Sequence, residues 1–170
     1  AVGAGLGIFS ASPTLVNNII RRNETFNDGS GWDLGQGGGV YIKRTSQPLL
    51  RHNQIISNIS GYGGGVFHWG EMRAAIESNF IAENYASQRA GGMLIWSAAP
   101  LIEGNRFEGN FAGVAGAISL GNDASPRIVN NYLIHNSTGA ILMGSSSATI
   151  RNNTIAGLGG HSAGRGIELW

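Results

Sequence analysis

Cysteine is absent from this sequence of 170 residues, which excludes disulfides and thiolate-bound metals. Charged residues make up only 12% of the chain, and the net charge of +1 gives no reason to expect nucleic acid or a membrane surface as a partner. No apolar run approaches the roughly 20 residues of a membrane-spanning helix. Nucleotide, zinc and nucleophile-triad motifs are also missing. These absences leave few candidates for a catalytic or metal-binding site.

Glycine, in contrast, is frequent, with 28 residues, and asparagine recurs in pairs five positions apart. Successive pairs are separated by 35, 26, 26, 26 and 22 residues. A repeat of this length is typical of a solenoid. The first asparagine of each pair is Asn18, Asn53, Asn79, Asn105, Asn131 or Asn153, and the second is Asn23, Asn58, Asn84, Asn110 or Asn136.

Each repeat contains three short apolar segments and no helical pattern of 10–12 residues. The first segment follows small residues, as in "GGGVYIK" at 37–43 and "GGGVFHW" at 63–69. The second ends at the first asparagine, and the third lies between the two asparagines. Because coils that wind in one direction stack equivalent strands in parallel, we predict an all-β, single-stranded parallel β-helix of about six coils with three parallel sheets.

Stacking of the coils places equivalent residues in columns. The inward column of the second strand comprises Leu15, Leu50, Ile76, Ile102, Ile128 and Ile150, and that of the third comprises Ile20, Ile55, Ile81, Phe107, Leu133 and Ile155. For the first strand we expect Ile8, Val40, Val66, Met93, Ile118, Ile141 and Ile167. The first asparagine of each pair is expected to adopt the left-handed conformation at a tight turn and to form an internal amide ladder. The second asparagine is expected at a more open corner.

The G-[GA]-[VIM] starts and the N-x4-N pairs resemble the right-handed parallel β-helix family, the pectin-lyase-like superfamily, over about residues 5–170. The resemblance implies one right-handed β-helix domain over residues 1–170. Members include pectate lyases, polygalacturonases, alginate-type lyases and epimerases, phage tailspikes and cell-surface passenger domains, so we expect a secreted or cell-surface protein. Because solenoids need capped ends, we also expect a segment of a longer solenoid, or an oligomer that covers its ends.

Two insertions interrupt the repeat at the same corner, over 24–36 and 157–165. In this family such loops often form the wall of the substrate cleft, and insertions in solenoids tend to lie on the binding face. The first insertion carries Asp28, Trp32 and Asp33, and the second carries His161 and Arg165. The alternative for both is a solvated turn.

An aromatic row is expected on the outer face of the first sheet. Alternation turns Tyr41 and Phe67 outward, together with Phe9, Leu94, Ser119, Leu142 and Glu168. Two positions further along, Trp69 and Trp96 become neighbours on the same face as Lys43 and Trp170. Exposed aromatic rows usually mark contact surfaces. The candidate ligand-binding residues are therefore Tyr41, Phe67, Trp69, Trp96 and Trp32, and their partner is either a polysaccharide or another protein domain or subunit.

The candidates for catalysis are few. His68 points inward between Ile42 and Ile95, near Glu71, Arg73 and Lys43, which form the best acid–base group on this face. On the second strand Glu77 and Glu103 are expected to stack, with Arg51 beside Glu77. Calcium needs six or more oxygen ligands, and no further acid lies in register. We therefore expect neither a metal nor another cofactor.

The catalytic signatures of the family are missing. The polygalacturonase pair of aspartates on adjacent coils, its Gly-His-Gly and Arg-Ile-Lys motifs, and the Asp-Pro-His motif of alginate epimerases do not occur. The sequence therefore favours a non-catalytic scaffold or binding module. The alternative is a polysaccharide lyase, glycoside hydrolase or epimerase, or a fragment of one.

Overall fold

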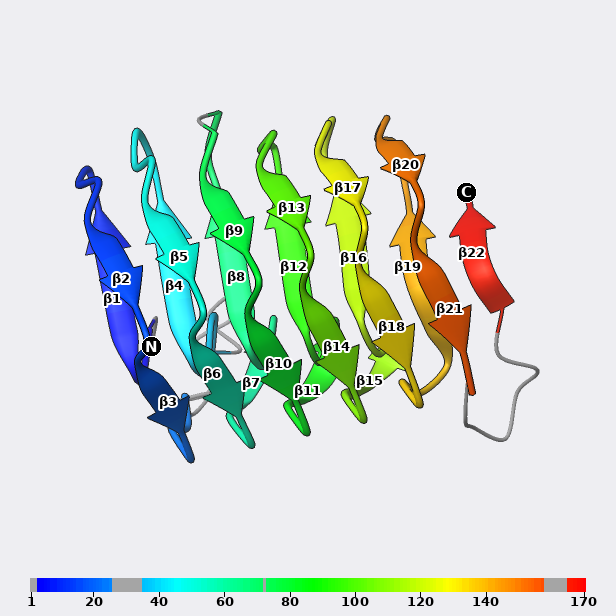
Figure 1. Ribbon diagram of the computed structural model, residues 1–170, viewed down its shortest axis with the longest axis horizontal. Coiled ribbons are helices and arrows are strands. Elements are labelled where there is room, and N and C mark those ends of the chain that lie inside the picture. The colour runs from blue at the N-terminus through cyan, green and yellow to red at the C-terminus, as the bar shows by residue number, and fades with distance from the viewer. Residues whose placement is uncertain (1–2, 26–34, 72, 158–164) are drawn as a thin grey trace.

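A solenoid of parallel strands makes up the described part of the chain, residues 3–25, 35–71, 73–157 and 165–170 of the computed structural model. The coils lie side by side along the long axis (Figure 1). The first sheet has seven strands, in the spatial order β1 (Leu6–Phe9), β4 (Val40–Lys43), β8 (Val66–Trp69), β12 (Met93–Trp96), β16 (Ile118–Gly121), β19 (Gly139–Met143) and β22 (Arg165–Leu169).

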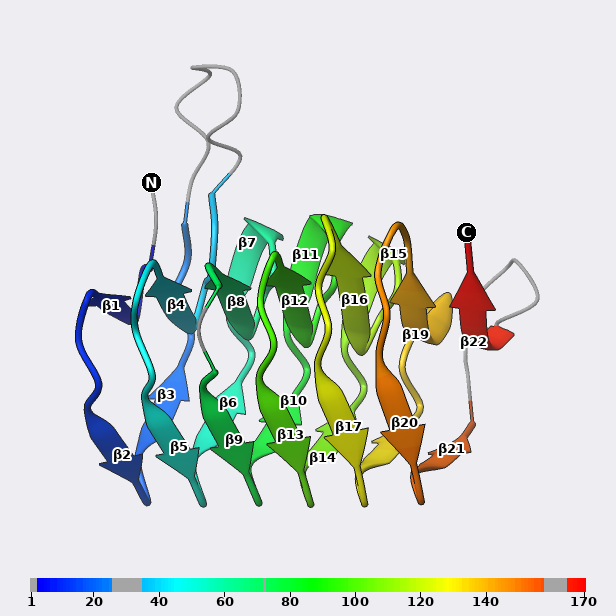
Figure 2. The same ribbon diagram turned by 90° about the horizontal axis from the view of Figure 1, so that it is seen from above.

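The second and third sheets have six strands each. The second contains β2 (Thr14–Val16), β5 (Leu49–Arg51), β9 (Ala75–Glu77), β13 (Leu101–Glu103), β17 (Arg127–Val129) and β20 (Thr149–Arg151). The third contains β3 (Ile19–Arg21), β6 (Gln54–Ile56), β10 (Phe80–Ala82), β14 (Arg106–Glu108), β18 (Tyr132–Ile134) and β21 (Thr154–Ala156). Figure 2 shows the first and second sheets on opposite sides of the core. The predicted parallel β-helix of about six coils is confirmed.

A fourth, short sheet was not predicted. It has three strands, β7 (Ile59–Tyr62), β11 (Tyr85–Arg89) and β15 (Phe111–Val114), which directly follow the second asparagines Asn58, Asn84 and Asn110. After each of these strands the chain reverses at a residue with positive φ and enters the first sheet, as at Gly63 (φ 61°) before β8. In Figure 2 the fourth sheet lies behind the strands of the first sheet.

The inward columns form one continuous core. On the second and third strands the register is as predicted, for example Ile76 opposite Ile102 and Ile81 opposite Phe107. On the first strand one prediction is wrong: Leu6, not Ile8, pairs with Val40, and Ile8 pairs with Ile42. The first sheet therefore contributes two inward columns, because its strands are longer than those of the second and third sheets.

Both asparagine columns form buried ladders. Asn79 accepts bonds at Oδ1 from the backbone N–H (2.9 Å) and the amide (3.0 Å) of Asn53. Its own amide donates to Asn105 Oδ1 (3.0 Å) and to the Leu50 carbonyl (2.9 Å). Asn84, in the second column, makes the same four kinds of bond. The predicted ladder at the first corner is confirmed, and the expectation of a more open second corner is wrong.

The left-handed residue of each corner precedes the ladder asparagine, which corrects the predicted placement of the tight turn. Ser78 (φ 52°) precedes Asn79, and Glu83 (φ 54°) precedes Asn84. The same holds for the other coils, whose preceding residues are Asn17, Arg22, His52, Ser57, Gly104, Gly109, Asn130, His135 and Asn152. This turn points the next side chain inward, so each ladder amide reaches the coils on either side.

The fourth sheet ends at β15 with a side-chain cap. In the next coil the chain passes directly from Asn136 to β19 and forms no further strand of this sheet. The Ser137 hydroxyl accepts a bond from the Ala112 N–H (3.0 Å) and donates to the Ala112 carbonyl (3.3 Å), to which Thr138 Oγ1 also donates (3.2 Å). Side-chain oxygens thus replace the backbone partners of a missing strand.

We predict that Asn79→Leu and Asn84→Leu lower the free energy of unfolding by similar amounts, on the order of 4 kcal/mol, because each leaves several buried donors and acceptors unpaired. Urea denaturation measures the loss. Gln54→Leu, which also replaces a side-chain amide with leucine but at an exposed outward position, is the matched control and should have little effect. A much smaller loss for Asn84→Leu would contradict the equivalence of the two ladders.

A second prediction concerns the edge cap. Ser137→Ala should cost about 1–2 kcal/mol, because the buried Ala112 N–H loses its partner. It should also speed the hydrogen exchange of this amide. Ser147→Ala, at an exposed serine, serves as the control. Unchanged protection of Ala112 would show that the hydroxyl does not cap this edge.

Candidate functional site

The last outward position of the first-sheet strands forms a row along the solenoid. Lys43, Trp69 and Trp96 follow one another in register on β4, β8 and β12, as predicted. Phe9 precedes them and Gly121 follows. Because the coils are stacked in this register, adjacent strands bring the two indoles and the ammonium group together at the carboxyl ends of the strands.

Two packing contacts hold the tryptophans of this row. The Lys43 ammonium lies 4.3 Å from the ring centroid of Trp69, a cation–π contact. Trp96 lies against Gly121, where an added Cβ would come within 2.7 Å of the indole. Trp69 remains 38% exposed and Trp96 is partly buried. Trp69 is therefore both oriented by a neighbour and accessible to a ligand.

A hollow of about 320 Å³ opens beside Trp69, where the first-sheet strands turn toward the second sheet. Its lining residues are Arg44, Thr45, Trp69, Gly70, Glu71 and Ser97. Gly70 has φ 139°, and a Cβ there would lie 2.5 Å from the Arg44 carbonyl oxygen, so glycine is needed for the close approach of these two turns. Thr45, Gly70 and Ser97 were not predicted, although Gly70 and Ser97 directly follow Trp69 and Trp96 and Thr45 lies two residues after Lys43.

The charge around the hollow is mainly positive. Arg44 and one carboxylate, that of Glu71, line it. The half-buried Lys43 contacts the lining indole of Trp69, and the exposed Arg73 follows Glu71 by two residues in sequence. Among the described lining residues Glu71 is the single acid, whereas glycoside hydrolysis by the usual route needs two carboxyl groups. The described part of the chain also contains no group of three or more His, Asp or Glu side chains that could hold a metal ion.

His68 lies on the other side of β8 from the hollow. Its side chain is fully buried between Ile42 and Ile95, as the sequence predicts. Burial lowers the pKa of His68 to about 4, and neither ring nitrogen has a hydrogen-bond partner among the described residues. This corrects the grouping of His68 with Glu71 and Arg73, because a buried imidazole does not reach a ligand in the hollow.

Tyr41 and Phe67 are buried, with 0% and 5% exposure, so their predicted exposure is wrong. They pack with Leu94 and with Ala90 at the end of the fourth-sheet segment. A Cβ at Gly63 would lie 3.0 Å from Phe67 Cβ, which shows how closely the returning chain covers this face. Trp32, the remaining candidate, lies outside the described residues, as do Asp28, Asp33 and His161.

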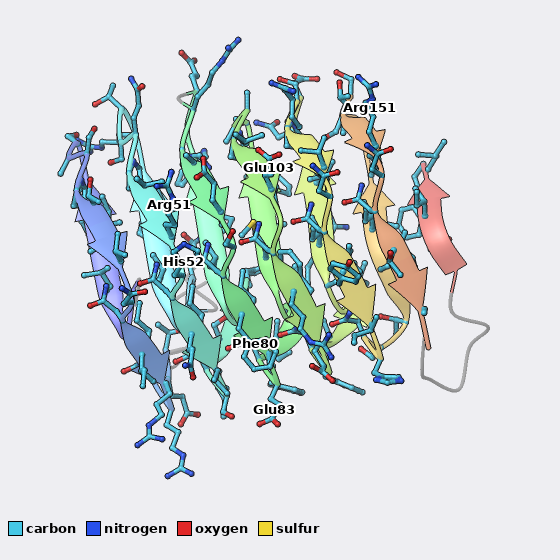
Figure 3. The ribbon with its side chains drawn as sticks, in the orientation of Figure 1. Arg51, His52, Phe80, Glu83, Glu103 and Arg151 are labelled. Atoms are coloured by element: carbon cyan, nitrogen blue, oxygen red, sulfur yellow. The ribbon has the colours of Figure 1, made fainter. Side chains whose placement is uncertain are left out.

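The outward row of the second sheet is a ladder of charges (Figure 3). Arg51 donates to Glu77 over 2.7 Å, as predicted, and Glu103 accepts a bond from the Asn130 amide at 3.2 Å. Arg51, Glu103 and Arg151 are visible on this face in Figure 3. Such exposed pairs contribute at most about 1 kcal/mol, and Arg51, Glu77 and Glu103 already have partners in this row, so we assign it no chemistry.

A separate pair of exposed rings lies on the fourth sheet. Tyr85 and Phe111 stack with ring centroids 5.8 Å apart and planes 8° from parallel. This pair was not predicted, although both residues directly follow a second ladder asparagine. It provides an aromatic surface on a different sheet from the row of Trp69 and Trp96.

The described part of the chain has no helix with the length and hydrophobicity of a transmembrane segment. No curated protein and no solved structure shows significant similarity to this chain. The sequence model of one family, described as the right handed beta helix region, matches residues 4–170. The match covers the solenoid from its first coil to its last strand. With its parallel coils and asparagine ladders, the chain belongs to the right-handed β-helix family.

Proposed function

We propose that this chain is a binding module without a reaction of its own, and that the hollow beside Trp69 and Trp96 takes a segment of polysaccharide. The observation that carries the proposal is the accessible Trp69 indole, oriented by Lys43 at the wall of a polar hollow. Sugar rings offer apolar faces to an indole and hydroxyls to groups such as Thr45, Ser97 and Glu71.

The inventory of the hollow favours binding over catalysis. One carboxylate, Glu71, is present among the described lining residues, and the nearest imidazole, that of His68, is buried on the other face of the strand. General acid–base catalysis requires a positioned proton donor and acceptor at the substrate. A polysaccharide ligand fits a secreted or cell-surface protein, and we propose that location for this chain.

The test is retention and turnover on a panel of acidic and neutral polysaccharides. We expect retention without product release, and loss of retention in Trp69→Ala plus Trp96→Ala. The matched control is Tyr85→Ala plus Phe111→Ala, which removes two exposed rings from the fourth sheet and should leave retention unchanged. Shortened or unsaturated products that vanish with Glu71→Gln would show an enzyme. Retention unaffected by the tryptophan changes would place the binding surface elsewhere.

A second prediction follows from the charge around the hollow. Since Lys43, Arg44 and Arg73 outnumber Glu71, the module should retain acidic polysaccharides better than neutral ones, and added salt should weaken this retention. Arg44→Gln should reduce the salt dependence, whereas Arg151→Gln, at an exposed arginine of the second sheet, should not. Equal retention of neutral and acidic polymers at low salt would contradict this charge preference.

A further inference from the structure

β8 connects the core of the solenoid to the hollow. It lies between β4 and β12 in the first sheet, and its residues alternate between the two faces. Val66 and His68 point into the core, and Trp69, the next residue, forms a wall of the hollow. A change in the packing of His68 is therefore transmitted to Trp69 through a single peptide unit.

The surroundings of His68 are apolar. Its neighbours in register are Ile42 and Ile95, and the equivalent residue one coil further is Leu120. No carboxylate or ammonium group is among the buried side chains of the described residues, whose other polar members are Asn, Ser, Thr and the phenol of Tyr41. His68 is thus an ionisable residue in a column whose neighbouring members are aliphatic.

The charged groups on the surrounding strands all face away from His68. Lys43 on β4 contacts the outer face of Trp69, and Arg51 on β5 pairs with Glu77 on β9 at the outer surface. The Tyr41 phenol packs on the outer side of the first sheet with Phe67, and β12 carries no titratable residue. The described core therefore offers no negatively charged group to an imidazolium ion at His68.

We propose that His68 is a proton-operated release element: its protonation loosens β8 between β4 and β12, which parts Trp69 from Lys43 and opens the hollow. The neutral imidazole is tolerated in the core, whereas the charged form requires water that only the loosened state admits. Release of a bound polysaccharide at acid pH is the consequence that rests on the proposed function.

The direction and the size of the pH effect on the loosening of β8 follow from the linkage between protonation and conformation. Burial lowers the pKa of His68 from 6.5 in an accessible state to about 4 in the closed state. The loosened state therefore binds more protons between these two values, and closure weakens as the pH falls through this window. The gap of about 2.5 pKa units limits the change in the open-to-closed ratio to about 300-fold.

Hydrogen–deuterium exchange without ligand, corrected for the intrinsic rate at each pH, tests the release element. Between pH 7 and pH 4 we expect exchange to accelerate in β8, by up to about 100-fold, and much less in β16, which has Leu120 in place of His68. His68→Ile, which matches its neighbours in the column, should abolish the difference, and His68→Leu is a second variant of similar volume. The control His52→Asn changes an exposed histidine to the residue found at the equivalent corner in Asn130, and should leave the difference intact.

Equal acceleration in β8 and β16, or acid acceleration in β8 that persists in both His68 variants, would overturn the proposal. The outcome is independent of whether a polysaccharide binds. Failure of retention at every pH, with the exchange difference present, would reject the proposed function and keep the release element. Retention at pH 7 with no exchange difference would reject the release element and keep the proposed function.

Discussion

The buried amide ladders are the constraint on which the rest of the structure depends. Each ladder asparagine uses both its oxygen and its amide group on neighbouring coils, so a coil that slipped by one residue would leave several buried polar groups unpaired. Unpaired groups of this kind cost about 1–3 kcal/mol each. The two ladders therefore set the register of the third strand, which lies between them, and through it the stacking of the whole coil.

The register explains where the chain tolerates variation. The distance from the first to the second asparagine is constant at five residues, while the segment from the second asparagine back to the first sheet varies greatly. In the coil that contains Ser137 this segment is too short to form a strand of the fourth sheet, and the Ser137 hydroxyl caps the exposed edge of that sheet. The larger insertions lie at this same corner, outside the ladders.

The hollow depends on the same stacking of the coils. Because each coil stacks in register, one lysine and two tryptophans in successive repeats become a row, and the turns that follow them form a polar pocket. Gly70 allows two of these turns to approach, since a larger residue would clash with the Arg44 carbonyl. Rigid stacking places Trp69, for which we propose a binding role, on the outside of β8, and the same strand carries His68, an ionisable side chain buried in the described core.

The sequence by itself determined the period, the parallel stacking, the inward columns of the second and third strands, and the charge ladder of Arg51 and Glu77. These follow from local repetition, because equivalent residues of successive coils must be neighbours. Only the tertiary structure decided that Tyr41 and Phe67 are buried and Trp69 accessible. Alternation shows on which face of a strand a side chain lies. Whether that face is exposed to solvent depends on which other segment of the chain packs over it. Here the fourth sheet returns over Tyr41 and Phe67 and leaves Trp69 uncovered.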